Sequence, residues 1–123
     1  MLKESKFQDD VVAFMRKKKC FIKPLTGSMF MAGMPDVMII NQANQIFFVE
    51  HKRWTLKHNP SAAELLDLLD GPQRNLIPNE LWVRKVFCPI VAIDCRDEDT
   101  VHITTNGLDM LRGSWQTYYA SLV

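Results

Sequence analysis

Two apolar segments separated by a short polar turn constrain this fold more than any other feature of the sequence. Residues 36–40 (Asp-Val-Met-Ile-Ile) and 46–52 (Ile-Phe-Phe-Val-Glu-His-Lys) are rich in β-branched and aromatic residues, which favour strands. The five polar residues 41–45 between them have the length of a hairpin turn. Both faces of each strand carry apolar residues, which predicts a hairpin inside a sheet that is covered on both sides.

The segments around this hairpin predict helices and further strands. Apolar residues at helical spacing predict an amphipathic helix over residues 4–19, and Ser61 is a suitable cap for a helix that ends near Leu69. The other expected elements are a strand at 20–25, a loop at 26–34, a helical stretch at 73–82 after a break at Gly71-Pro72, strands at 89–94 and 101–104, and a final helix capped by Asn106. This order predicts a mixed α/β fold in a single domain, residues 1–123.

The hairpin also brings charged residues together. If the turn is centred on Ala43, Asp36 lies opposite Glu50, and directly opposed residues have Cβ atoms roughly 4.5–5.5 Å apart. Lys52 lies two residues beyond Glu50 and therefore points to the same side of the sheet. A shift of the register by one residue would place the two acids on opposite faces, in which case they are ordinary surface residues.

Two opposed carboxylates at the margin of a core need compensation, because like charges repel and buried anions are costly. A divalent cation provides it, and Lys52 provides part of it. Mg²⁺ suits the arrangement, since it takes oxygen ligands and commonly binds through one or two carboxylates together with substrate phosphate. The pattern is therefore typical of a site for phosphodiester hydrolysis, in which Lys52 stabilises developing negative charge.

Composition excludes several other classes of protein. The net charge of +1 does not by itself indicate nucleic-acid binding, because it is far from the strong basic excess of many nucleic-acid-binding domains. Three cysteines without CxxC spacing and three histidines without HxxxH spacing argue against a disulfide framework and a zinc site. Without a signal-like N-terminus or a long apolar stretch, we expect a cytoplasmic or otherwise intracellular protein, including a viral protein inside a host cell, with no membrane partner.

The hairpin and its flanks resemble the PD-(D/E)xK nuclease superfamily. The resemblance is carried by Gly33-Met-Pro-Asp36 and by Val49-Glu-His-Lys52, and it is greatest to the VRR-NUC branch, with similarity to Holliday-junction resolvases. Glu4, which opens the first helix, is similar to an acidic residue of that branch, and Gln73 resembles its downstream glutamine. His51 departs from the pattern, because an aliphatic residue is common at that position.

This resemblance implies a restriction-endonuclease-like core, with a central mixed β-sheet flanked by helices. It implies that Asp36 and Glu50 ligate Mg²⁺ or Mn²⁺ with help from the His51 backbone carbonyl and from Glu4, that Lys52 assists the attacking water, and that Gln73 supports the site. The implied activity is that of a metal-dependent DNA endonuclease, including one selective for branched or junction DNA. The implied partners are DNA and a second copy of the chain in a homodimer, with no small-molecule organic cofactor.

Gln73 and two basic residues are further candidates for substrate binding. Lys23 can point into the same cleft or simply be solvated, and Arg53 directly follows the site. In the segment Arg53-Trp54…Lys57, the tryptophan can stack on a base or can anchor a loop. Two alternatives to the nuclease stay open: a nucleic-acid-binding module that keeps the fold without cutting, and an assembly domain whose carboxylates are surface residues.

Overall fold

A six-stranded mixed sheet forms the centre of the described protein. The structure is a computed structural model, and it describes residues 3–25 and 32–123. In order across the sheet, the strands are β1 (Phe21–Pro24), β2 (Val37–Ile40), β3 (Ile46–Trp54), β4 (Ile90–Asp94), β5 (Thr100–Thr104) and β6 (Leu111–Ser114). The pair β3–β4 is parallel and the other neighbouring pairs are antiparallel. The predicted mixed α/β fold with a central mixed sheet is confirmed.

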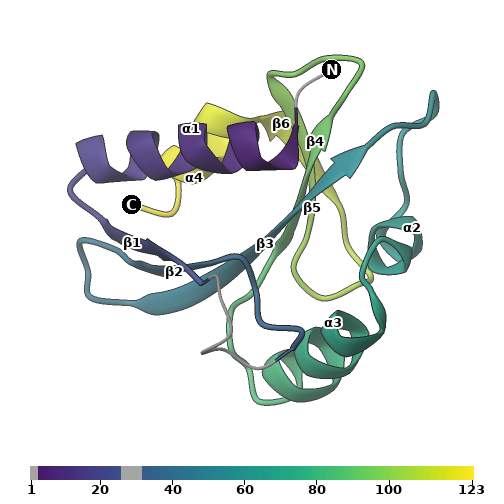
Figure 1. Cartoon of the computed structure of the whole chain (residues 1–123), viewed down its shortest axis with the longest axis horizontal. Helices are drawn as coiled ribbons and strands as arrows, with labels where there is room; N and C mark the ends of the chain where they lie inside the picture. The colour runs from purple at the N-terminus through teal and green to yellow at the C-terminus, as the bar shows by residue number, and fades with distance from the viewer. Residues whose placement is uncertain (1–2, 26–31) are drawn as a thin grey trace.

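Helices cover both faces of the sheet (Figure 1). On one face lie α1 (Glu4–Lys17) and α4 (Trp115–Ala120), which pack with the strands around one apolar cluster. On the other face lie α2 (Ala62–Asp67), α3 (Gly71–Leu76) and the π-helix η1 (Ile77–Trp82), around a second cluster. No helix within the described residues has the length and apolar character to span a membrane.

Side-chain caps fix the start of the two short helices α2 and α3. Ser61 accepts a hydrogen bond from the Glu64 backbone N–H and the Glu64 carboxylate accepts one in return, so the predicted cap is confirmed as a capping box. Asp70 and Gln73 form the same arrangement at α3. The helix that Ser61 caps does end before Gly71-Pro72, as predicted, but these two residues belong to the next helix: they occupy the first turn of α3, where proline loses no intrahelical bond.

The prediction of one final helix capped by Asn106 is wrong. The Asn106 side chain does accept hydrogen bonds from the backbone N–H groups of Leu108 and Asp109, both at 2.8 Å, but the chain then turns instead of continuing as a helix. Residues 111–114 pair with β5 as β6, and α4 starts only after Ser114. Pairing with the preceding strand β5 thus overrides the local helical pattern.

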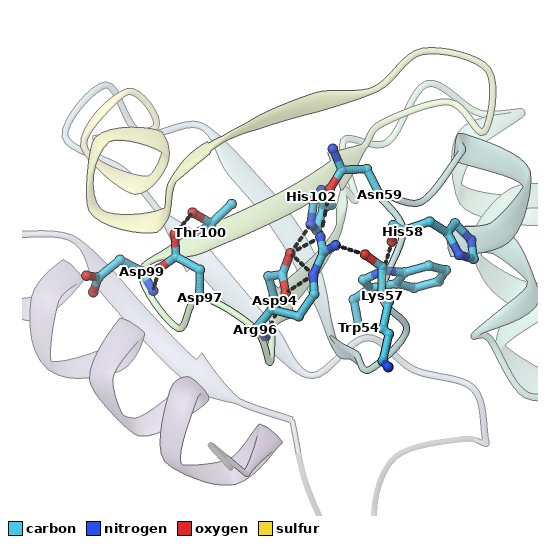
Figure 2. A network of polar contacts seen from close by, with 10 residues as sticks. All are labelled: Trp54, Lys57, His58, Asn59, Asp94, Arg96, Asp97, Asp99, Thr100 and His102. Atoms are coloured by element: carbon cyan, nitrogen blue, oxygen red, sulfur yellow. Dashed lines mark hydrogen bonds and ion pairs between the residues drawn. The ribbon is translucent and has the colours of Figure 1, made fainter.

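The buried carboxylate of Asp94, at the end of β4, lies at the centre of a hydrogen-bond network (Figure 2). Asp94 is 1% exposed, and its Oδ2 accepts hydrogen bonds from His102 Nε2 at 2.8 Å and from Arg96 Nη2 at 2.6 Å. The Arg96 guanidinium also donates to the Lys57 carbonyl and to Asn59 Oδ1. The network therefore ties the loop after β3 to the turn between β4 and β5.

We expect Asp94→Asn to lower the free energy of unfolding by about 2–4 kcal/mol, because a buried charge partner is removed from two cationic or polar donors. Glu80→Gln is the control: it removes an exposed ion pair with Arg84 and should cost no more than about 1 kcal/mol. Urea denaturation at pH 7 measures both changes. Equal effects for the two variants would contradict the role of Asp94.

Candidate metal centre

The register of the β2–β3 hairpin determines where the acidic residues lie. Ile40 pairs with Ile46, Met38 with Phe48, and Val37 with Val49, which confirms the predicted register. Asp36 directly precedes β2, and its Oδ2 accepts a hydrogen bond of 2.8 Å from the backbone N–H of His51. Asp36 is therefore held beside the strand that carries Glu50.

Three carboxylates converge at this end of the hairpin. Glu4 lies in the first turn of α1, Asp36 directly before β2, and Glu50 in β3. Each offers one oxygen, and these oxygens lie within 4.8 Å of one another. Oxygens of three carboxylates at this spacing are a suitable donor set for a hard divalent cation such as Mg²⁺ or Mn²⁺. The residues thus come from three separate elements that the sheet and α1 bring together.

Glu50 is the most constrained member of the group. It is 1% exposed, and its Oε2 accepts a hydrogen bond from Gln73 Nε2 at 2.9 Å and lies 3.4 Å from Lys52 Nζ. Its Oε1 is buried and has no hydrogen-bond partner among the residues that the structure describes. A buried carboxylate oxygen without a donor is costly, so this atom fits the place of a ligand to a cation.

The electrostatics of the metal-free group are unfavourable for three negative charges. Burial, followed by the charge of Asp36, raises the pKa of Glu50 from its ordinary 4.5 to about 8. Burial also raises the pKa of Asp36 and of Glu4, although Lys52 and, for Asp36, the His51 N–H oppose the shift. A cation that replaced the bound proton would remove this conflict, and the donor set therefore fits a divalent metal ion.

A close contact between two backbone segments fixes the loop that precedes Asp36. Gly33 has a φ of +87°, and a Cβ atom built on it would lie 2.4 Å from the Pro72 carbonyl oxygen. Only glycine fits both the backbone angle and the contact. This contact seats the loop before Asp36 on the first turn of α3, which carries Gln73.

His51 lies on the opposite side of β3 from Glu50 and is completely buried. Its Nε2 is 2.6 Å from the Tyr119 hydroxyl, and its Nδ1 is 3.4 Å from Gln8 Oε1. Burial lowers the pKa of the imidazole to about 3, so the ring is neutral near pH 7. The use of the His51 carbonyl as a metal ligand stays a prediction.

The remaining candidates have different positions. Gln73 reaches the site through Glu50, as described above. Lys23 is exposed on β1 opposite Met38, and Arg53 lies on the α1 side of β3, where its charge acts on Glu4. Trp54 is buried and donates a 2.7 Å hydrogen bond to the His58 carbonyl, so it anchors the loop after β3 and does not stack on a base.

Two structural relationships at the site have no local sequence signal. The contact between Gly33 and Pro72 joins residues that are far apart in the chain, although a glycine before Pro-Asp is compatible with a special backbone angle. The hydrogen bond between His51 and Tyr119 spans 68 positions, and only the pairing of strands and helices brings these residues together.

No protein-family model matches the sequence, and no curated protein matches it. Among solved structures, the chain is similar to Hjc, a Holliday junction resolvase from the archaeal hyperthermophile Archaeoglobus fulgidus, with 12% sequence identity and a TM-score of 0.49. The match covers 93% of this chain and 90% of that chain. A likeness of this size shows nothing about catalytic residues, metal or substrate, and the resemblance to the VRR-NUC branch stays a prediction.

The raised pKa of Glu50 predicts how pH changes the stability of the metal-free protein. The pKa of Glu50 is about 8 in the folded protein and about 4.5 in the unfolded chain, so a proton on Glu50 favours the folded state. This contribution to the free energy of unfolding is complete below pH 4.5 and is lost as the pH rises through 8. Relative to Glu50→Gln, the wild-type free energy of unfolding should fall over this range, with a slope approaching about 1.4 kcal/mol per pH unit. Denaturation of both proteins in EDTA measures the difference, and a difference independent of pH would refute the shift.

A second prediction concerns the glycine contact. Gly33→Ala should lower the free energy of unfolding by at least about 1–2 kcal/mol, because alanine meets both an unfavourable φ and the Pro72 carbonyl. Gly71→Ala is the matched control, since a Cβ there meets nothing within 4 Å. Thermal and chemical unfolding compare the two variants, and comparable losses would show that the contact at Gly33 is unimportant.

Proposed function

We propose that this protein is a divalent-metal-dependent DNA endonuclease that hydrolyses phosphodiester bonds. The observation that carries the proposal is the convergence of Glu4, Asp36 and Glu50 beside Lys52, with one buried Glu50 oxygen lacking a hydrogen-bond donor in the described structure. Such a group resembles a site for a cation and a phosphate more than a structural ion pair.

Each residue has a distinct role in this proposal. Asp36, Glu50 and Glu4 hold the cation, with the His51 carbonyl as a further ligand. When bound, Mg²⁺ or Mn²⁺ supplies positive charge at a phosphoryl oxygen and lowers the pKa of water. Lys52, whose ammonium group is 3.4 Å from Glu50 Oε2 and mostly buried, orients the attacking water and offsets negative charge as it develops on the phosphate.

Gln73 orients Glu50 without needing to contact the substrate. Its side-chain amide donates to Glu50 Oε2, while its own position is fixed by the capping box with Asp70. This leaves Oε1 of Glu50 as the oxygen for the cation. Hydrogen bonds of this kind from surrounding residues commonly set the orientation and the affinity of metal ligands.

DNA as the substrate is supported by the sequence resemblance to PD-(D/E)xK nucleases, which the Gly33–Asp36 and Val49–Lys52 segments carry. Within this proposal, branched or junction DNA is the preferred substrate and a homodimer is the working form. Lys23 and Arg53 are proposed to contact the phosphate backbone, where cationic side chains contribute most of the affinity.

We expect the protein to cut plasmid, linear duplex or four-way-junction DNA in Mg²⁺ or Mn²⁺, and Lys52→Ala to lower the cleavage rate at least about 100-fold. Asp36→Asn should have a similar effect because it removes a ligand charge. Lys17→Ala is the matched control: this lysine is exposed in the last turn of α1, at the opposite end from Glu4, and its loss should change the rate less than about 2-fold.

The outcome distinguishes the nuclease from its alternative. If the wild-type protein leaves all three substrates intact with both metals, the nuclease proposal is wrong. Salt-dependent DNA binding without cleavage would instead support a non-catalytic nucleic-acid-binding module that keeps the fold.

A further inference from the structure

A series of three polar side chains, buried at His51 and Tyr119 and half-buried at Gln8, lies directly behind the candidate metal centre. His51 follows Glu50 on β3, and its side chain points to the opposite face of the sheet, where it is completely buried. There it contacts Gln8 of α1 and Tyr119 of α4, which is also fully buried. The series therefore joins the strand that carries Glu50 to two helices from opposite ends of the sequence.

The chemistry of the three side chains determines which atom donates and which accepts in each hydrogen bond. A neutral imidazole has one N–H donor and one acceptor nitrogen. Since Gln8 Oε1 only accepts hydrogen bonds, Nδ1 carries the proton, and Nε2 accepts from the Tyr119 hydroxyl at 2.6 Å. Removal of the hydroxyl would leave the buried Nε2 without a donor, which is costly.

Aromatic contacts of Phe7 also help to fix the position of α1. The Phe7 ring lies edge-on to His51, with centroids 5.3 Å apart, and it also contacts Trp115 of α4 at 5.8 Å. Glu4, Phe7 and Gln8 are spaced three and four residues apart, so they share one face of α1. The residues that His51 contacts on α1 are thus on the same face as the third carboxylate.

We propose that His51, supported by Tyr119, is a positioning residue for Glu4, an inference that rests on the metal-dependent function proposed above. Its side chain fixes the rotation and the height of the first turns of α1 against β3. Its backbone N–H meanwhile holds Asp36 Oδ2 at 2.8 Å. One residue thereby orients two of the three carboxylates, Asp36 directly and Glu4 through the helix.

Apolar packing alone would fix α1 less well. The cluster around His51 is otherwise hydrophobic, and apolar surfaces tolerate small rotations and shifts. Hydrogen bonds between polar side chains break when the helix moves, so they favour a single position of α1 against β3. This selection accounts for a fully buried histidine at a position where an apolar side chain would avoid the cost of burying polar atoms.

The test is a double-mutant cycle with Mn²⁺ affinity as the readout, measured by calorimetry on the full chain without DNA. Tyr119→Phe removes only the hydroxyl and keeps the ring contacts with Trp115 and Tyr118. We expect it to weaken Mn²⁺ binding roughly 10-fold, as changes in the partners of metal ligands commonly do. In a Glu4→Gln background the same substitution should weaken binding less than about 2-fold, because its effect passes through Glu4.

Tyr118→Phe is the matched control. The Tyr118 hydroxyl is buried but has no hydrogen-bond partner within residues 3–25 and 32–123, so its removal should leave Mn²⁺ affinity unchanged. Equal effects at positions 118 and 119, or a full effect of Tyr119→Phe in the Glu4→Gln background, would overturn the positioning role alone. A wild-type protein that binds no Mn²⁺ would overturn the proposed function as well, so the two failures are distinguishable.

Discussion

The antiparallel pairing of β2 with β3 places the acidic residues of the candidate metal centre together. Val37 and Ile39 of β2, and Phe47 and Val49 of β3, are buried on the face that α1 covers. Because side chains alternate between faces, a shift of one residue would expose one strand's apolar set to the wrong side. Burial of each such side chain is worth about 1.5–3 kcal/mol, so the core strongly favours the observed register. The position of Asp36 beside Glu50 follows from this apolar packing, and the acids themselves oppose it.

Consecutive residues in the middle of β3 contact the helices on both faces of the sheet. Glu50 and Lys52 point toward α3, whereas His51 points toward α1 and α4. Hydrogen bonds from both layers therefore act on consecutive residues of a single strand. A site on a central strand is held more rigidly than a site on loops, and rigid placement of charged groups is what electrostatic catalysis requires. The cost is a raised pKa at Glu50, which the protein tolerates because the surrounding apolar clusters supply the stability.

The sequence predicts the features that local chemistry determines, and it misses those that depend on pairing or packing with another element. The hairpin register and the Ser61 cap follow from turn length, alternation and capping chemistry, all of which act within a few residues. The strand β6 could not be predicted, because Leu111–Ser114 becomes a strand only through its pairing with β5. The hydrogen bond between Tyr119 and His51 could not be predicted either, since the two residues are 68 positions apart and meet only through the packing of α4.

The sheet contains a second buried carboxylate, which provides an internal comparison for Glu50. Asp94 is equally buried, but both of its oxygens accept hydrogen bonds, from Arg96 and His102. These donors hold the pKa of Asp94 well below its ordinary value, as expected of a charge satisfied by its own protein.

Glu50 differs from Asp94 in each of these respects. Two residues reach one of its oxygens, none of the described residues reaches the other, and its pKa is raised instead of lowered. The same sheet therefore satisfies one buried acid completely and another, on the neighbouring strand, incompletely. Glu4 and Asp36 add further negative charge beside Glu50, so the repulsion is relieved either by a proton on Glu50 or by a cation among the three carboxylates, and Asp94 needs neither.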